Sequence, residues 1–441
     1  MSQPQQKLEC IVPRYLEAFR CTGSACDDDC CHHWRIGIDQ ITYKKVKNSM
    51  DCSRVDRERF RQGIKRNRAA GPGKGDYASI ALKADGSCPF QETDKLCVIH
   101  RRFGEDHLSQ VCQTYPRKVN QLGHRLEVTA TLSCPVAARG CLLEEGAMDL
   151  VMVDPARHAN PRLLHVARMP AGQADPFQAY LDDIRDVMLH LLGNRLFPLS
   201  SRLFFATFFA NRLKSFLRPG MTAFSEEALA AEVDLLGNHG NLNRLHQEFE
   251  ALEPAIALPM SIIQTMLLYR AGRARSVFEG LLWRVWGIYG GDGRLTVMNK
   301  DAAIQVDASQ MIEQYRQRRD RLQAVFGPRI DLYFENYCRN YWFGQWYTSS
   351  ASLLEHAQNL QVRVAVLRFL LFSHPSLTDL CGEKNLAVEE AQATLDRVAV
   401  EVFYKFSRGI EHDNCLLQQV QNALMEQGLV SFAHTVLLAK F

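Results

Sequence analysis

The sequence predicts a mostly α-helical protein, in which a small mixed α+β N-terminal cysteine-cluster domain precedes a large all-helical region. Two observations lead to this fold class. Eleven of the fourteen cysteines lie at or before Cys141, among short stretches where apolar and polar residues alternate as in strands. Beyond about residue 165, apolar residues recur at the spacing of amphipathic helices. We therefore expect a cysteine-cluster domain over residues 1–150 and a helical domain over residues 165–441.

The first domain is expected to be built from short elements. Alternation predicts strands over residues 34–39, 79–82, 96–99 and 126–132. Residues 40–69 are rich in Lys and Arg, and we expect helix there with the charges on a solvated face. Pro135 suits a first helical turn, so it predicts that a helix begins just after Cys134.

A glycine-rich stretch at residues 71–75 has the composition of a nucleotide-binding loop. Such a loop follows a buried apolar strand and opens a helix. The preceding residues 66–70 are Arg-Asn-Arg-Ala-Ala, which cannot form a buried strand. Residues 287–294 also lack a preceding strand. Both stretches are therefore predicted to be ordinary loops.

The second domain shows helical patterns over most of its length. We expect helices over residues 175–193, 307–326, 386–406 and 416–438. Gly193 should end the first of these, and Gly327-Pro328 should stop the second, because proline cannot continue a helix.

Composition excludes some classes of protein. The net charge of +3 is too small to indicate a nucleic-acid-binding protein. The best apolar run, residues 203–210, is far shorter than a membrane span, and the first twenty residues lack the apolar core of a signal peptide. We therefore expect a cytoplasmic protein with no membrane partner, in which thiols stay reduced and disulfides are rare.

The cysteines of the first domain are the main functional signal. Eight of them are candidate metal ligands: Cys21, Cys26, Cys30, Cys31, Cys88, Cys97, Cys112 and Cys134. Thiolates repel one another, so a cation or cluster is needed to hold several together in a reducing compartment. Their spacing favours an iron–sulfur cluster, since no second close pair completes a zinc ribbon; zinc remains the alternative.

Residues close to the first thiols add little to this prediction. The radical enzymes that cleave methyl donors carry C-x3-C-x2-C, but His33 occupies the third thiol position after Cys26 and Cys30. Radical chemistry is therefore not expected. His32 and His33 are expected to be solvated rather than metal-bound, and residues 27–29, three aspartates, to serve turn formation.

The cysteine pattern resembles the flagellin lysine-N-methylase family of bacteria. The motifs that carry the resemblance are Phe19-Arg20-Cys21-x4-Cys26-x3-Cys30-Cys31-x2-Trp34, Cys88-Pro89-Phe90, Cys97, Cys112-x2-Tyr115-Pro116-Arg117 and Ser133-Cys134-Pro135. They cover about the first third of the chain. The same set is similar to the wider family of putative zinc- or iron-chelating cysteine-cluster domains.

The resemblance implies a protein-lysine N-methyltransferase that moves methyl groups from S-adenosylmethionine to lysine side chains of flagellin. It also implies an iron–sulfur cluster, which we expect to be of the 4Fe-4S type. The competing hypothesis is a non-catalytic iron–sulfur or zinc protein that serves electron transfer or interaction. No catalytic base can be assigned from the sequence.

Candidate donor-binding residues come from two places. Tyr115 and Arg117 either form a turn after a metal ligand or reach the donor carboxylate. Asn340 and Tyr341 lie in residues 333–347, whose aromatic side chains form two neighbouring rows on a helix. That helix is either a buried core helix with one wet edge or a wall of the methyl-transfer pocket, where aromatic rings would suit a sulfonium cation.

Overall fold

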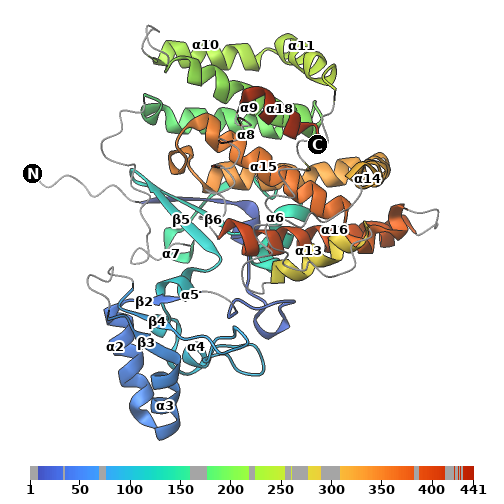
Figure 1. Ribbon diagram of the computed structural model, residues 1–441. Helices are drawn as coiled ribbons and strands as arrows, with labels where there is room; N and C mark the ends of the chain where they lie inside the picture. The colour runs from blue at the N-terminus through green and yellow to red at the C-terminus, as the bar shows by residue number, and fades with distance from the viewer. Residues whose placement is uncertain are drawn as a thin grey trace, which may run out of the picture. The chain divides into compact units, whose positions relative to one another are not determined.

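The computed structural model shows a mainly helical protein (Figure 1). It describes residues 8–32, 35–68, 76–158, 176–217, 224–253, 260, 277–289, 308–381, 387–412, 422, 426, 428 and 431–441. The chain divides into two compact units: Met1–Ala137 with Leu150–Val166, and Ala138–Asp149 with Ala167–Phe441. A small α+β unit and a large helical unit confirm the predicted fold class.

The first unit contains a four-stranded sheet in the order β5-β6-β1-β7. Its strands are β1 (Glu9–Pro13), β5 (Arg117–Leu122), β6 (Arg125–Ala130) and β7 (Leu150–Val153). The chain's first strand is central: β1 pairs in parallel with β6 and antiparallel with β7. Val12, Leu126 and Val128 are buried, because alternate positions along these strands face the same side of the sheet.

A second sheet of three short strands has the order β2-β4-β3. The strands are β2 (Gly37–Ile38), β3 (Ile64–Arg66) and β4 (Ala78–Ile80). The helices of the unit are equally short: α1 (Arg14–Ala18), α2 (Gln40–Ser49), α3 (Arg54–Gly63), α4 (Val98–Phe103), α5 (Gln110–Thr114), α6 (Pro135–Leu143) and α7 (Pro155–His158). Single turns lie at η1 (Gly23–Ala25), η2 (Met50–Cys52) and η3 (Glu105–His107).

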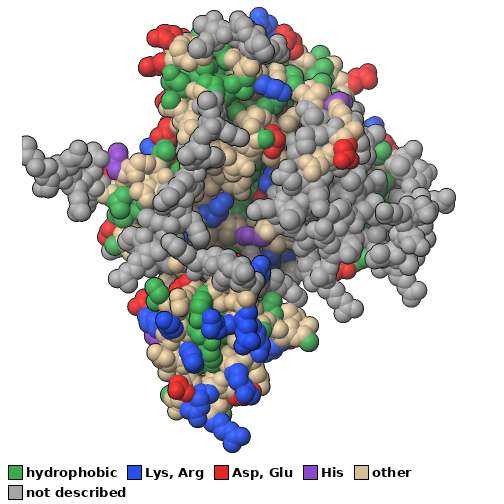
Figure 2. Space-filling view, turned by 60° about the vertical axis from the view of Figure 1, so that its left-hand side comes forward, with side chains coloured by type: hydrophobic (Ala, Val, Ile, Leu, Met, Phe, Trp, Pro, Cys, Tyr) green, Lys and Arg blue, Asp and Glu red, His purple; other side chains and the backbone are tan. Residues whose placement is uncertain are grey.

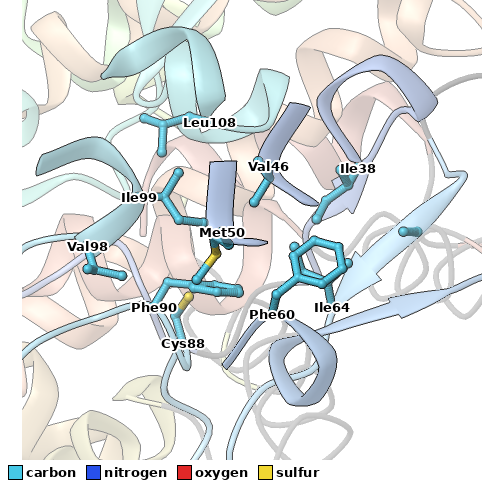
Figure 3. Close-up of a cluster of buried hydrophobic side chains, with 11 residues drawn as sticks. Ile38, Val46, Met50, Phe60, Ile64, Cys88, Phe90, Val98, Ile99 and Leu108 are labelled. Carbon is cyan, nitrogen blue, oxygen red and sulfur yellow. The ribbon is translucent and has the colours of Figure 1, made fainter. Parts of the chain in front are cut away.

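One apolar core joins the second sheet to its helices (Figure 3). Its buried residues are Ile38, Val46, Met50, Phe60, Ile64, Ala78, Cys88, Phe90, Val98, Ile99 and Leu108. Side chains that meet here come from α2, α3, α4 and the loop before α4. Because each element is short, this core depends on contacts between segments that are far apart in the sequence.

The second unit is built from longer helices. They are α8 (Leu181–Gly193), α9 (Leu199–Ser215), α10 (Glu226–Gly237), α11 (His239–Glu250), α13 (Val277–Gly287), α14 (Ala308–Gly344), α15 (Leu353–Phe372), α16 (Val388–Phe406) and α18 (Phe432–Ala439). Shorter turns are η5 (Gln178–Tyr180), η6 (Tyr347–Ser349), η7 (Pro375–Leu377), η8 (Asp379–Cys381) and the π-helical turn η9 (Ser407–Glu411). Helix α9 packs against α8, α15 and α18, and α15 also packs against α14 and α16.

Several local predictions are confirmed and two are wrong. Strands β4 and β6, the end of α8 at Gly193 and the start of α6 at Pro135 agree with the sequence. Residues 96–99 are not a strand, because Cys97 caps α4 and Val98 begins that helix. The basic stretch is not helical throughout, since residues 64–66 form β3.

The helix stop predicted at Gly327-Pro328 is confirmed, because α14 consists of two helical segments that meet at a kink there. Phe326 leaves helical geometry, with φ −120° and ψ 15°, and a second helical segment continues from Pro328 to Gly344. Proline lacks an N–H but is tolerated in a first helical turn, so it can begin the second segment.

Two expectations fall largely outside the described part of the chain. The loop at residues 71–75 is one, and most of the helix expected over residues 416–438 is the other. Within the described residues, none of the helices is long and apolar enough to cross a lipid bilayer.

Candidate functional site

The thiols of the first unit converge at the edge of its apolar core. Cys88 is buried within that core, and Cys31, Cys97 and Cys112 pack against it. Figure 3 shows the Cys88 sulfur beside Phe90 and Met50. Every cysteine whose side chain the structure describes is a free thiol, so disulfides do not explain the convergence.

Cys31 and Cys88 are the most tightly linked pair. The Cys88 backbone N–H donates to the Cys31 carbonyl over 2.8 Å. The two thiols are also hydrogen-bonded, and Cys31 makes a second such contact with Cys30. These bonds raise the pKa of Cys31, whereas the bond from Cys31 lowers the pKa of Cys88 to about 7. Cys88 is therefore the thiol that ionises first.

Three cysteines share a local geometry that favours a thiolate. The Cys88 sulfur accepts from the backbone N–H groups two and three residues later, those of Phe90 and Gln91. The sulfur of Cys97 accepts from the corresponding two groups at the start of α4. Cys134 repeats the pattern at the start of α6. Burial raises the pKa of Cys97 and Cys134, and the backbone N–H groups directed at each sulfur oppose that rise.

Cys112 completes the first group of thiols. Burial, together with negative charge on Cys97, Cys88 and Cys30, raises its pKa to about 12. Cys30, Cys31, Cys88, Cys97 and Cys112 therefore lie within electrostatic range of one another. Without a cation, these sulfur atoms cannot all be ionised together.

The remaining predicted ligands form a second group. Burial raises the pKa of Cys134 to about 11, and the charges of Cys26 and Cys21 add to the effect. Cys21 also accepts a hydrogen bond from the Gly23 backbone N–H at 3.5 Å. The eight predicted ligands are thus divided into a group of five and a group of three.

The donor set of the larger group suits a soft metal or an iron–sulfur cluster. It consists only of thiols, and two of them already have N–H groups directed at the sulfur. Among the described residues, however, no group of three or more His, Cys, Asp or Glu side chains stands in a ready-made metal-binding arrangement. The thiols would have to draw closer when a metal binds.

Asp29 has a structural role beside the first thiols. Its carboxylate accepts from the Cys31 backbone N–H at 2.8 Å and contacts His32 Nδ1 at 2.7 Å. Burial opposes ionisation, but these hydrogen bonds lower the pKa of Asp29 below its ordinary value. Asp29 thus fixes the turn that presents Cys31, as the sequence predicted. His33 lies outside the described residues.

Tyr115 and Arg117 lie near the smaller thiol group. The Tyr115 hydroxyl is 3.1 Å from Ser133 Oγ, one residue before Cys134. The Arg117 guanidinium stacks on Phe19 at 5.4 Å, and burial lowers its pKa although negative charge on Glu105 and Cys21 opposes this. A half-buried guanidinium beside an aromatic ring can bind a carboxylate with two parallel hydrogen bonds.

The aromatic rows of residues 333–347 are buried in the second unit. Tyr333, Tyr337 and Tyr341 are at most 5% exposed. The Tyr337 hydroxyl donates to Glu411 at 2.7 Å, and Tyr333 donates to Asp396. Burial raises the pKa of Tyr337 well above its ordinary value, so this phenol stays neutral. These hydroxyls donate hydrogen bonds to carboxylates on other elements. Helix α14 therefore contributes polar as well as apolar contacts to the core.

Tyr341 belongs to a network that the sequence did not predict. Its ring stacks on His356 with the centroids 4.6 Å apart, and the Arg363 guanidinium lies 5.1 Å from the ring centre. Arg363 is also 3.8 Å from Glu411. Asn340, the next candidate, is half-buried on the same helix. The partners come from α15 and η9, so no pattern within residues 333–347 could have indicated them.

The polar edge of this helix, for which the sequence predicts solvent exposure, is also buried at Glu335. Glu335 is 2% exposed, and its carboxylate accepts from Arg202 at 2.7 Å and from Arg195 at 3.0 Å. Arg195 lies in the segment between α8 and α9, and Arg202 lies within α9. A buried charge must be paired, and the sequence alone does not show where its partners lie.

The FliB lysine N-methylase C-terminal domain family matches residues 185–438, more than half of the sequence. The chain belongs to this family.

Individual relatives are similar over a shorter stretch. The flagellar biosynthetic protein FliU of Salmonella muenchen is 31% identical over 140 residues, which are 31% of this chain and 79% of that protein. The lysine-N-methylases of Salmonella typhimurium and Salmonella choleraesuis are also 31% identical over 140 residues, but the match spans only 33% of each of them. No solved structure matches the chain.

Proposed function

We propose that the protein is a methyltransferase that moves methyl groups from S-adenosylmethionine to lysine side chains of flagellin. Membership of the lysine N-methylase family is the observation that supports this proposal most strongly. The flagellar name of one relative supports the substrate. The convergence of thiols in the first unit agrees with the cysteine motifs from which the resemblance was first drawn.

The reaction is a displacement at the methyl carbon. The lysine nitrogen forms a bond to that carbon while the carbon–sulfur bond breaks, and S-adenosylhomocysteine leaves as a neutral thioether. Only the neutral amine can attack, and a free lysine has a pKa of about 10.4. The protein must therefore desolvate the amine or accept its proton, and must align nitrogen, carbon and sulfur.

Two pairs of residues, one in each unit, are proposed as alternative places where the donor binds. Arg117, with Tyr115 beside it, offers a half-buried cation suited to the carboxylate of the methionine portion. In the second unit, Asn340 offers a half-buried amide, whereas the predicted Tyr341 ring is 5% exposed and already contacts His356 and Arg363. Arg117→Lys should weaken donor binding more than tenfold, because lysine retains the charge but loses the planar pair of hydrogen bonds.

We further propose that the group of five thiols holds an iron–sulfur cluster, with zinc as the alternative metal. Cys30, Cys31, Cys88, Cys97 and Cys112 supply the candidate ligands. Bound there, the cluster would supply cross-links between three segments of the first unit. This is a structural role, and it requires the reducing conditions of the cytoplasm, where we place the protein.

The deciding experiment uses anaerobically purified protein with flagellin and S-adenosylmethionine. We expect saturable donor binding by calorimetry, and flagellin lysines that gain methyl groups by mass spectrometry. Flagellin that gains no methyl groups while donor binding is absent would refute the enzyme proposal. Iron and acid-labile sulfide are measured on the same sample, and stoichiometric zinc without iron would refute the cluster.

A non-catalytic metal protein is the second candidate. The thiol convergence favours it independently, because that convergence lies in the first unit and does not involve the family match at residues 185–438. Full metal content without donor binding would support this candidate.

A further inference from the structure

Basic residues are concentrated in one part of the first unit. Residues 35–68 contain eleven Lys and Arg but only four Asp and Glu, a net charge of +7 in a chain whose total is +3. The rest of the chain is therefore slightly acidic. In Figure 2, Lys and Arg side chains gather on this unit with hydrophobic side chains among them.

Helices α2 and α3 divide this stretch into an inner and an outer face. Val46 and Met50 from the α2–η2 segment, with Phe60 and Ile64 from the end of α3, fill the apolar core. Lys44 and Lys47 on α2 and Arg54 on α3 are exposed, as are the cations that lie in or just after β3, Lys65, Arg66 and Arg68. The core thus fixes these helices as a platform whose outer surface is charged.

The four acidic residues of the stretch are all engaged locally. Asp39 caps α2 through the N–H groups of Ile41 and Thr42. The other three, Asp51, Asp56 and Glu58, pair with Arg57, Arg102 and Arg61, respectively. None of the four is left to balance the remaining cations.

Six cations stay exposed without an ion pair among the described residues. They are Lys44, Lys47, Arg54, Lys65, Arg66 and Arg68. We name this set, with the exposed apolar residues Ile41 and Val55, the basic face. Like charges held together on a rigid platform attract a negatively charged partner over about one Debye length, ~10 Å at moderate salt.

Two apolar side chains indicate the kind of partner. Ile41 is 80% exposed at the start of α2, and Val55 is 76% exposed at the start of α3. Such side chains gain nothing from a phosphate backbone, which is bound mainly through its charge. They suit a protein surface, where apolar contacts accompany complementary charges.

We propose that the basic face docks an acidic segment of the protein substrate. This inference rests on the proposed function and deepens it, because it separates recognition of the substrate from the methyl-transfer site. A cationic face repels the lysine that is to be methylated, so it would engage a different, acidic part of the same substrate. Docking would raise the substrate's local concentration without contributing to the chemical step.

The test compares two double variants with the wild-type protein. Lys44→Gln with Arg54→Gln removes two cations from the basic face. Lys214→Gln with Arg397→Gln, the matched control, removes two exposed cations of the second unit that have no ion pair among the described residues. Methylation is measured with intact flagellin and with a short lysine peptide that lacks Asp and Glu, each at low and moderate salt.

We expect the first variant to raise KM for intact flagellin about fivefold or more at low salt with kcat unchanged. It should leave the peptide reaction as in the wild type, and the control should change neither. An unchanged KM for flagellin would overturn the inference, as would an equal loss with the peptide. A loss of affinity for duplex DNA with flagellin kinetics intact would also overturn it.

The outcomes also separate this inference from the proposed function. Wild-type protein that methylates neither substrate would refute the proposed function, and the docking inference would fall with it. Wild-type methylation that the first variant leaves unaltered would refute the docking inference alone.

Discussion

The two units achieve stability in different ways. In the first unit, no described helix that lies wholly within it exceeds the ten residues of α2 and α3. In the second unit, α15 alone has twenty residues, and all but two of them are buried. Long helices bury enough apolar surface to pack on one another, whereas short ones depend on each connection between them. Thiols gather in the first unit, although buried carboxylates there, Asp56 and Glu127, are also paired with arginines.

Buried polar groups mark the second unit. Glu335, Asp396 and Glu411 lie on or against α14, and each meets an arginine or a tyrosine hydroxyl. A core with this many charges is specific in its pairing, because a misplaced helix would leave a charge without its partner. The first unit is distinguished by its converging thiols.

The largest expected effect is the loss of the first unit's thiol centre. Cys31→Ser removes the thiol that contacts both Cys30 and Cys88. We expect loss of the metal and of most soluble protein, and the same result for Cys30→Ser. Iron, zinc and soluble yield are the measurements. Cys52→Ser is the control, since that exposed cysteine belongs to neither thiol group; full metal content in the first two variants would contradict the assignment.

The second largest effect should come from the second unit. Glu335→Gln leaves the buried Arg202 without its 2.7 Å carboxylate partner. Removing one partner of a buried pair costs about 3–5 kcal/mol of unfolding free energy. Urea unfolding followed by circular dichroism measures this loss. Glu313→Gln, which breaks an exposed pair with Arg316, should cost less than about 0.5 kcal/mol; similar losses in the two variants would show that burial is not the cause.

A pH effect should be smaller and should also arise in the second unit. Burial lowers the pKa of His374 to about 4, although negative charge on Glu401 opposes this. The unfolded histidine has a pKa near 6.5, so below that pH it binds a proton that the folded histidine does not bind. Stability is therefore complete above about pH 6.5, and about 2 kcal/mol of it should be lost by pH 5.

Unfolding by urea at pH 7 and pH 5 measures this loss. His374→Gln should reduce the difference between the two pH values by that amount. An unaltered difference would mean that other groups govern the acid sensitivity.

The smallest effect compares helix caps in the two units. Asp39 accepts from two N–H groups at the start of α2, and Ser352 accepts from the Glu355 N–H at the start of α15. Replacing either with alanine should cost about 1 kcal/mol. Hydrogen exchange should show that Asp39→Ala loosens much of the first unit, whereas Ser352→Ala loosens only the first turn of α15. If both variants show faster hydrogen exchange only in the first turn of the affected helix, the two units do not differ in this respect.

The sequence predicted the architecture better than the contacts. Apolar periodicity was enough for α8 and α16, because their stripes recur over several turns. It failed at residues 96–99, where Cys97 serves as a helix cap and the apolar residues begin α4. Four residues carry too little periodicity to separate a strand from a first helical turn.

The candidate site was predictable only in part. The cysteine motifs indicated thiols that converge, and Cys31, Cys88, Cys97 and Cys112 do lie at one core. Their division into groups of five and three could not be read from spacing, since it depends on how α4, α5 and α6 fold back. The polar stripe of α14 was predicted to face solvent because the arginines that neutralise Glu335 come from other parts of the chain.

The placement of β1 has a consequence for how the protein is made. Residues 9–13 are translated well before their partners, which are residues 125–127 and 150–153. The central strand of the sheet must therefore wait, unpaired, until more than a hundred further residues have been translated. All eight candidate ligands precede β7 in the chain, so each sulfur atom is synthesised before β7 can complete the four-stranded sheet. Metal supply during translation would thus act on a nascent chain whose first strand still lacks its neighbours.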